Sequence, residues 1–209
     1  MAGELIIPSG AIVQGNLTVT GSMLPAIART KLATDQSASY PIAWEAWRVW
    51  DAYGTNLPAT GGTDDLGLYG GTFTTNTPSI QTGDVKTTSG TRYARCVVMV
   101  PPNFVTGGTF KIRAHAGAKT TAADGSMTID FQAYRSDKED SLGSDLVTTA
   151  ATTINSTSKA NKDFTVDSAT LIPGDLLDIR MAVTWVDTSA VTAVIGFVGS
   201  VEILMDIQG

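Results

Sequence analysis

Cysteine, histidine and charge are all scarce in this sequence of 209 residues. The single cysteine, Cys96, excludes an internal disulfide and any zinc site built from several cysteines. The single histidine, His115, is the one possible base for a Ser-His-Asp site, and the alternation around it places it on the outward face of a strand. Charged residues make up 16% of the chain, with a net charge of −6 and no run of Lys and Arg. This balance argues against nucleic-acid binding, which depends on clustered basic residues.

Long hydrophobic runs are missing as well. No segment approaches the ~20 apolar residues that a membrane-spanning helix requires. The N-terminal stretch MAGELIIPSG has an early acid and no basic residues, unlike a secretion signal. We therefore expect no membrane insertion, and synthesis in a cytoplasm.

Signatures of catalysis and of cofactor binding are absent from the sequence. It contains no G-x-S-x-G elbow before a helix, no P-loop, no dinucleotide fingerprint and no H-E-x-x-H. Two carboxylates from distant positions could still form a glycosidase pair, although glutamates are few and none stands out as a buried acid. Asp64 and Asp65 could contribute to a calcium site, but they are far short of the roughly six to eight oxygen ligands required. We expect a protein that is not an enzyme and that has no cofactor or metal.

Period-two alternation is the strongest pattern that the sequence does contain. After the turn at Pro173–Gly174, apolar residues fall on every second position, while their neighbours are polar or small. The apolar set is Leu177, Ile179, Met181, Val183 and Trp185. This pattern predicts a long strand with one apolar face, which a second sheet must cover.

The same pattern recurs from Tyr93 onward. Strands are predicted around 93–99, 110–115, 127–134, 164–166 and 195–205, and the two glycines of the last suggest a bend or bulge. Strands at this spacing without intervening helices favour an all-β antiparallel β-sandwich over residues 31–209. The order of strands and turns over 92–206 resembles the jelly-roll modules of viral structural proteins, which implies a jelly-roll-like sandwich.

The first 30 residues differ from the rest of the chain. Short β-branched pieces alternate with Gly, Pro and Ser, and each piece is too short to form a stable sheet alone. The phrase GNLTVTGS resembles the Gly-bounded strand units of tailed-phage fibre and spike proteins. The resemblance implies an extended anchoring or oligomerisation segment that buries Ile6, Ile7, Ile12, Val13, Leu17 and Val19. An edge hairpin packed on the main domain is the alternative.

Three tryptophans recur at intervals of three in the next segment. Trp44, Trp47 and Trp50 would form a ridge on a helical turn, or they could begin a strand. Aromatic faces stack on sugar rings, so the row is a candidate glycan platform; packing in the core or at a subunit interface is the favoured alternative. Tyr69 and Phe73 are further aromatic candidates in a Gly- and Thr-rich loop.

Two functions follow from these features. The first, implied by the fibre resemblance, is a virion structural protein: a capsid decoration, spike or fibre subunit that forms a homotrimer and attaches to other proteins of a phage particle, such as the major capsid protein. The alternative is a glycan-binding β-sandwich that uses its aromatic residues to hold a host-surface sugar. The first predicts a stable oligomer without ligand, and the second predicts saturable sugar binding.

Overall fold

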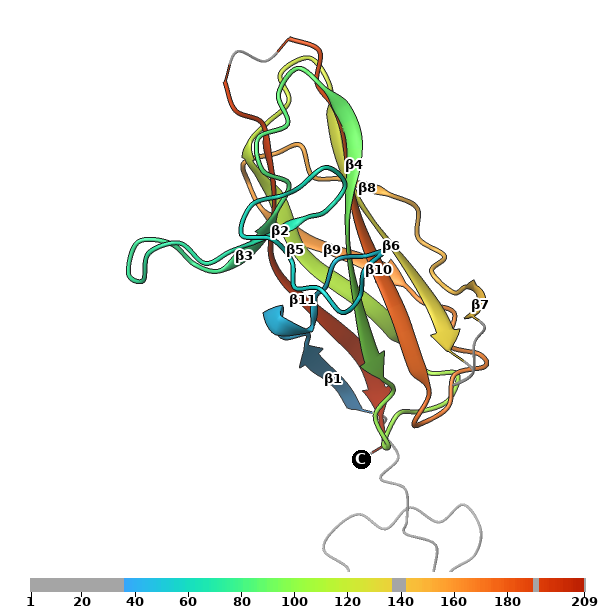
Figure 1. Cartoon of the computed structure of the whole chain (residues 1–209). Coiled ribbons are helices and arrows are strands. Elements are labelled where there is room, and N and C mark those ends of the chain that lie inside the picture. Colours follow the sequence, from blue (N-terminus) through green and yellow to red (C-terminus); the bar gives the residue numbers. More distant parts are fainter. Residues whose placement is uncertain (1–35, 137–141, 190–191, 209) are drawn as a thin grey trace, which may run out of the picture. The chain divides into compact units, whose positions relative to one another are not determined.

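Two antiparallel sheets pack face to face as a β-sandwich (Figure 1). The structure is a computed structural model, and it describes residues 36–136, 142–189 and 192–208. The all-β class and the antiparallel sandwich predicted from the alternation are confirmed. The segment 1–30 lies outside the described residues, so its predicted extended form stays a prediction.

The first sheet has the strand order β2-β3-β11-β5-β9, and β1 also pairs with β11. Its strands are β1 (Gln36–Pro41), β2 (Gly67–Tyr69), β3 (Ser79–Gln81), β5 (Phe110–Thr120), β9 (Ala160–Thr165) and β11 (Ile195–Ile207).

The second sheet has the strand order β4-β10-β6-β7, and β8 also pairs with β6. Its strands are β4 (Ser89–Met99), β6 (Ser126–Ser136), β7 (Leu142–Asp145), β8 (Thr152–Thr153) and β10 (Leu176–Val186). A short 3₁₀ turn, η1, spans Trp44–Ala46. Within the described part of the chain, no helix has the length and apolar character needed to cross a membrane.

Strand β10 is the central strand of the second sheet. It pairs in unbroken register with β4 on one side and with β6 on the other, from Leu176 to Val186. Its five alternate apolar residues, from Leu177 to Trp185, are at most 5% exposed. The alternation predicted for this strand is therefore confirmed, because burial of one face fixes the register of a strand.

The core lies between the inner faces of the two sheets. Phe131 of β6 meets Phe164 of β9 across it, with ring centroids 4.9 Å apart. Cys96 is fully buried, and burial together with the nearby Asp178 charge raises the pKa of its thiol. Cys96 therefore stays a protonated, small apolar residue of the core, as the alternation around it predicts.

Strand β11 is irregular at its glycines. Its register with β5 shifts between Ile195 and Gly196, and again between Val198 and Ser200. The buried positions change parity there: Val198 is buried before the second shift and Val201 after it. The bend or bulge predicted from the two glycines is thus confirmed. Because of the bulge, apolar side chains on both sides of it point into the core.

Three short strands were not expected from the sequence. β1 and β3 lie in stretches without clear alternation, and β3 is buried along its whole length although it reads Ser-Ile-Gln. The third is β7, Leu142–Asp145, which is exposed along its whole length and lies in the acidic stretch after β6. Short strands that add to an existing edge need little pattern of their own, because the partner strand supplies the register.

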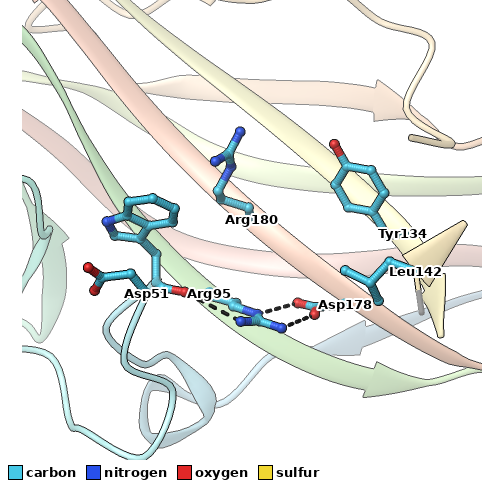
Figure 2. A pocket seen from close by; sticks show the side chains of 7 residues that line it. Asp51, Arg95, Tyr134, Leu142, Asp178 and Arg180 are labelled. Carbon is cyan, nitrogen blue, oxygen red and sulfur yellow. Dashed lines mark hydrogen bonds and ion pairs between the residues drawn. The ribbon is translucent and has the colours of Figure 1, made fainter. Parts of the chain in front are cut away.

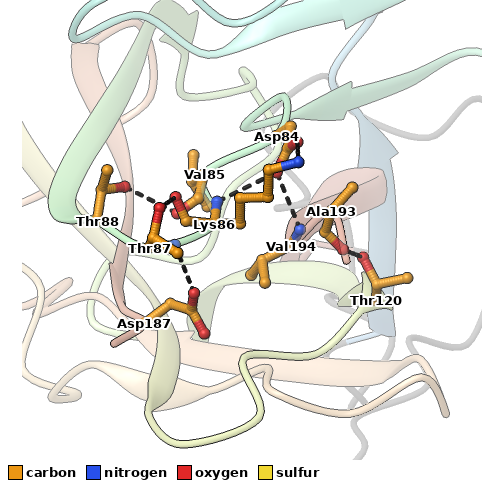
Figure 3. Close-up of polar contacts among 9 residues, drawn as sticks. All are labelled: Asp84, Val85, Lys86, Thr87, Thr88, Thr120, Asp187, Ala193 and Val194. Carbon is orange, nitrogen blue, oxygen red and sulfur yellow. Dashed lines mark hydrogen bonds and ion pairs between the residues drawn. The ribbon is translucent and has the colours of Figure 1, made fainter. Parts of the chain in front are cut away.

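Polar contacts join the loop that follows β3 to the two ends of the connection between β10 and β11 (Figure 3). Asp84 Oδ1 accepts hydrogen bonds from the backbone N–H of Lys86 and of Val194, each at 3.1 Å. Asp187 Oδ2 accepts one from Thr87 N–H at 2.6 Å. Slight burial opposes ionisation of Asp84, but these N–H groups and the Lys86 ammonium outweigh it and lower the pKa of this carboxyl. Side-chain carboxylates therefore add to the backbone hydrogen bonds between these loops, such as Val85 N–H to Val194 O at 2.9 Å.

Replacing Phe131 with Ala tests the position of the core. The change removes a ring that is 1% exposed and leaves a cavity against Phe164, so we expect the free energy of unfolding to fall by about 3–5 kcal/mol. Thr128→Ala, on the opposite face of the same strand, is the control and should cost less than about 1 kcal/mol. Urea denaturation measures both; equal losses would contradict the assignment of inner and outer faces.

Candidate functional site

The outer face of the second sheet carries the polar residues that alternate with the core. In the register, Arg180 of β10 lies between Arg95 of β4 and Gln132 of β6. One row away, Asp178 of β10 lies opposite Tyr134 of β6. Cross-strand neighbours on one face are close enough for their side chains to interact. Three strands therefore present a continuous row of hydrogen-bonding groups.

The segment from Arg48 to Leu66 covers the free edge of β4. Arg48 and Arg95 exchange two backbone hydrogen bonds of 2.8 and 3.0 Å. Tyr93 N–H donates to Asp64 O, and Leu66 N–H donates to Tyr93 O, both at 2.8 Å. The segment thus satisfies the backbone of an edge strand, and it brings Trp50 onto the outer face.

Trp50 packs against residues of β4 and β10 and is half-buried. Its ring centroid is 5.0 Å from that of Tyr93. The Arg180 guanidinium carbon lies 5.6 Å from the Trp50 centroid and 4.9 Å from the Tyr93 centroid. Trp50 Nε1 donates to Asp64 Oδ2 at 3.3 Å. Ring contacts and this hydrogen bond hold the indole in place, so the aromatic surface is formed before any ligand arrives.

Arg95 and Asp178 form a forked ion pair beside the indole. Arg95 Nε donates to Asp178 Oδ1 at 2.7 Å, and Nη2 donates to Oδ2. Asp178 is 6% exposed, and the hydrogen-bonded carboxylate raises the pKa of Arg95 against the effect of its partial burial. The pair neutralises the cation that lies directly opposite Arg180 in the register. Two arginines can therefore sit side by side on this face.

These residues line a pocket of about 280 Å³ on the outer face. Figure 2 shows Arg180 and Tyr134 rising from β10 and β6, with the Arg95–Asp178 pair beside them. Trp50, Asp51 and Leu142 complete the lining. The pocket joins a fixed aromatic ring to polar groups that converge from three strands and from the covering segment, as ligand sites commonly do.

Asp130 of β6 is a half-buried acid one row away from Arg180 on the same face. Burial raises the pKa of the Asp130 carboxyl, and the Asp145 carboxylate raises it further. The backbone N–H of Phe131 and the Arg180 cation act in the opposite direction without cancelling the rise. Ionisation of Asp130 therefore lowers the stability of the native state relative to the unfolded state.

The structure separates the three tryptophans, which were predicted either to form a ridge on a helical turn or to begin a strand. Trp50 lines the pocket on the outer face, whereas Trp47 is 1% exposed and belongs to the core. Trp44 is half-buried and lines a second hollow of about 500 Å³ together with Trp47 and Arg48. The 3₁₀ turn ends at Ala46 and extended backbone follows, so the side chains diverge. Which of them binds a glycan or a subunit stays a prediction.

Other residues singled out in the sequence lie apart from this pocket. His115 is on the outer face of the first sheet, where Nδ1 is 2.9 Å from Asn161 Oδ1. Asp64 accepts the hydrogen bond from Trp50 described above. Partial burial raises the pKa of the Asp65 carboxyl, and the negative charges of Asp64 and Asp51 raise it further. In the described residues, no three His, Cys, Asp or Glu side chains gather closely enough to hold a metal ion.

The residues expected to anchor the chain lie outside the described residues. They are Ile6, Ile7, Ile12, Val13, Leu17 and Val19. The virion function, the homotrimer and the attachment to other particle proteins depend on this segment, and they stay predictions.

Four residues of the pocket were not identified as a site from the sequence. Arg95, Tyr134, Asp178 and Arg180 are outward residues of strands that the alternation did predict. The register that puts them in adjacent rows depends on which strands are neighbours. The sequence pattern determines the faces of each strand but not that order.

Comparisons with known proteins identify no family for this chain. No protein-family model matches it, and no curated protein matches it. Among solved structures, it is similar to the CBM22-2 xylan-binding domain of Xyn10C from Paenibacillus barcinonensis, with a TM-score of 0.42 and 19% sequence identity. The match covers 80% of this chain and 98% of that chain. A similarity of this size leaves the ligand to be inferred from the side chains of this protein.

Asp130 gives a prediction with a definite sign. Because its native pKa is raised above the unfolded value, ionisation destabilises the native state, and stability falls as pH rises from the unfolded pKa through the native one. Below the unfolded pKa both states are protonated and the cost disappears. Asp130→Asn should therefore stabilise the protein at pH 7 and have less effect at pH 3, measured by urea denaturation.

Asp206 is the matched control with the opposite sign. Hydrogen bonds from Thr109 lower the pKa of its carboxyl, so its contribution to stability is present above the unfolded pKa and is lost as pH falls through the native value. Asp206→Asn should destabilise the protein at pH 7. If both variants shift stability in the same direction at pH 7, the assigned environments are wrong.

Proposed function

We propose that this β-sandwich is a carbohydrate-binding protein that holds a neutral glycan in the pocket formed by Trp50, Tyr134 and Arg180. The proposal rests above all on the position of Trp50, which is half-buried, fixed by its neighbours, and bordered by polar groups that line the same pocket. A sugar ring has an apolar C–H face and a rim of hydroxyls. An immobilised indole matches the face, and the convergent polar groups match the rim.

The hydrogen-bonding groups of the pocket suit sugar hydroxyls. Arg180 has five N–H donors, and one of them is bonded to Gln132 Oε1. Tyr134 offers a hydroxyl that both donates and accepts, and the exposed Asp51 offers carboxylate oxygens at the same pocket. The Arg95–Asp178 pair keeps these groups in place before the ligand binds, which reduces the entropy lost on binding.

The charge of the pocket favours a neutral ligand. Its lining contains two carboxylates, Asp51 and Asp178, and two guanidinium groups, Arg95 and Arg180, so its formal charge is zero. The chain as a whole carries −6, which repels an anionic polysaccharide at long range. Neutral polysaccharides are therefore the ligand class that we assign.

Binding without chemistry is the activity that we infer. Asp178, one of the two acids that line the pocket, is held by Nε and Nη2 of Arg95 in a forked pair. A general acid must lie within hydrogen-bond reach of the proton that it transfers, and the Asp178 oxygens are already engaged by Arg95. The site is thus suited to holding a sugar and not to cleaving its glycosidic bond.

Trp50→Ala tests the proposed ligand surface. We expect it to weaken binding to neutral polysaccharides by at least about tenfold, equivalent to about 1.4 kcal/mol, because the stacking face is lost. Binding is measured by a glycan array followed by titration calorimetry. Trp44→Ala is the matched control: it removes a half-buried tryptophan from the second hollow, so affinity should stay unchanged.

Several results would contradict this assignment. Wild-type protein that binds no neutral polysaccharide excludes the proposal. Loss of binding in Trp44→Ala and not in Trp50→Ala would move the site to the second hollow. Melting temperatures of both variants separate lost contacts from lost folding.

The absence of cleavage is a prediction of its own. Wild-type protein incubated with the polysaccharide that it binds should release no new reducing ends, because Asp178 is committed to Arg95. A reducing-sugar assay measures this, with buffer alone as the baseline. Release above that baseline, abolished by Asp178→Asn, would show that the site is catalytic.

A further inference from the structure

A projecting finger, residues 70–78, joins β2 to β3 and carries an almost fully exposed aromatic ring. The finger extends away from the sandwich (Figure 1), and each of its residues is exposed. Phe73, at its turn, is 90% exposed. Backbone N–H groups of Thr75 and Asn76 both donate to Thr72 O, at 3.0 and 2.9 Å. The turn is therefore closed by its own backbone, and it holds an apolar side chain in solvent.

A second feature of the same chain complements this ring. An apolar hollow of about 270 Å³ lies where the end of β4 approaches β1. Its lining includes Tyr40, Ile42, Met99, Phe110 and Met205, and none of its lining residues is charged. Met99 is 58% exposed. The hollow offers an apolar surface that a ring entering from outside can cover.

The absence of charge on both surfaces is compatible with a contact between two copies of this chain. Two copies that each carry −6 repel one another over most of their surfaces. The finger contains no charged residue, and neither does the lining of the hollow. These neutral surfaces let two copies approach without like charges meeting at the contact.

We infer that Phe73 of one copy inserts into the hollow beside Met99 of a second copy. The finger and the hollow are different surfaces of the protein, so the contact is head-to-tail. The assembly closes into a ring if the rotation between neighbouring copies permits, and otherwise it extends as an open filament. The free edge of β1 adds to the contact, because β1 pairs only with β11 among the described strands. Finger backbone can therefore extend the sheet while the ring fills the hollow.

Site-specific cross-linking of full-length chains tests this contact directly. Copies carrying Phe73→Cys are mixed with copies carrying Met99→Cys and treated with a short bismaleimide. Native Cys96 is fully buried, so it does not compete for the reagent. We expect a heterodimer that is at least about tenfold more abundant than in a control mixture of Ile172→Cys with Met99→Cys. Ile172 is also exposed, at 53%, but it lies outside the finger.

The mass of the assembly gives an independent measurement. Phe73→Ala should lower the association constant by at least about tenfold in sedimentation equilibrium, whereas Ile172→Ala should leave it unchanged. Heterodimer no more abundant than in the control mixture overturns the inference. So does an unchanged association constant together with weaker polysaccharide binding by Phe73→Ala, since the finger would then contact the glycan.

Discussion

Cross-strand pairing of β10 on both sides is the constraint on which the rest of this structure depends. A strand with period-two alternation has two faces, and burying the apolar one determines where every polar neighbour points. The alternate apolar residues from Leu177 to Trp185 face the core. Asp178 and Arg180 lie between them in the sequence, so they must face outward. The unbroken register with β4 and β6 then places Arg95, Gln132 and Tyr134 beside them. The binding face thus follows from the same alternation that forms the core.

The outer face becomes a pocket only because β4 is an edge strand. Its free backbone groups bind the segment that contains Arg48 and Asp64, and covering an exposed edge in this way also protects it from pairing with other chains. The covering segment adds Trp50, which lies over Arg180 and Tyr93. The segment that protects the edge is therefore also the one that supplies the aromatic ring of the proposed binding pocket. A change that loosens the Arg48–Arg95 pairing affects both.

The sequence predicts the long strands of the sandwich but not the pocket. Alternation is strong in β5, β6 and β10 because each has one fully buried face, and it identifies their inner residues correctly. The pocket depends on strand order and on the path of 48–66, which long-range backbone pairing determines. Spacing left open whether the three tryptophans form a ridge on a helical turn or begin a strand. Extended backbone after Ala46 sends Trp47 into the core and Trp50 to the surface.

Self-association would raise the overall affinity that this small pocket can provide for a polysaccharide. A hollow of about 280 Å³ holds a small part of a polysaccharide, and the affinity of such a contact is limited by the few groups that it engages. Copies joined head-to-tail present the same pocket at repeated intervals, and a polymeric sugar offers repeated ligands. Once one pocket is occupied, the others bind at a high effective concentration, which raises the overall affinity by roughly 10²–10⁴ where the spacing allows. The neutral finger and the neutral pocket are therefore consistent with one physical strategy, in which an acidic protein binds neutral polymers through many weak contacts.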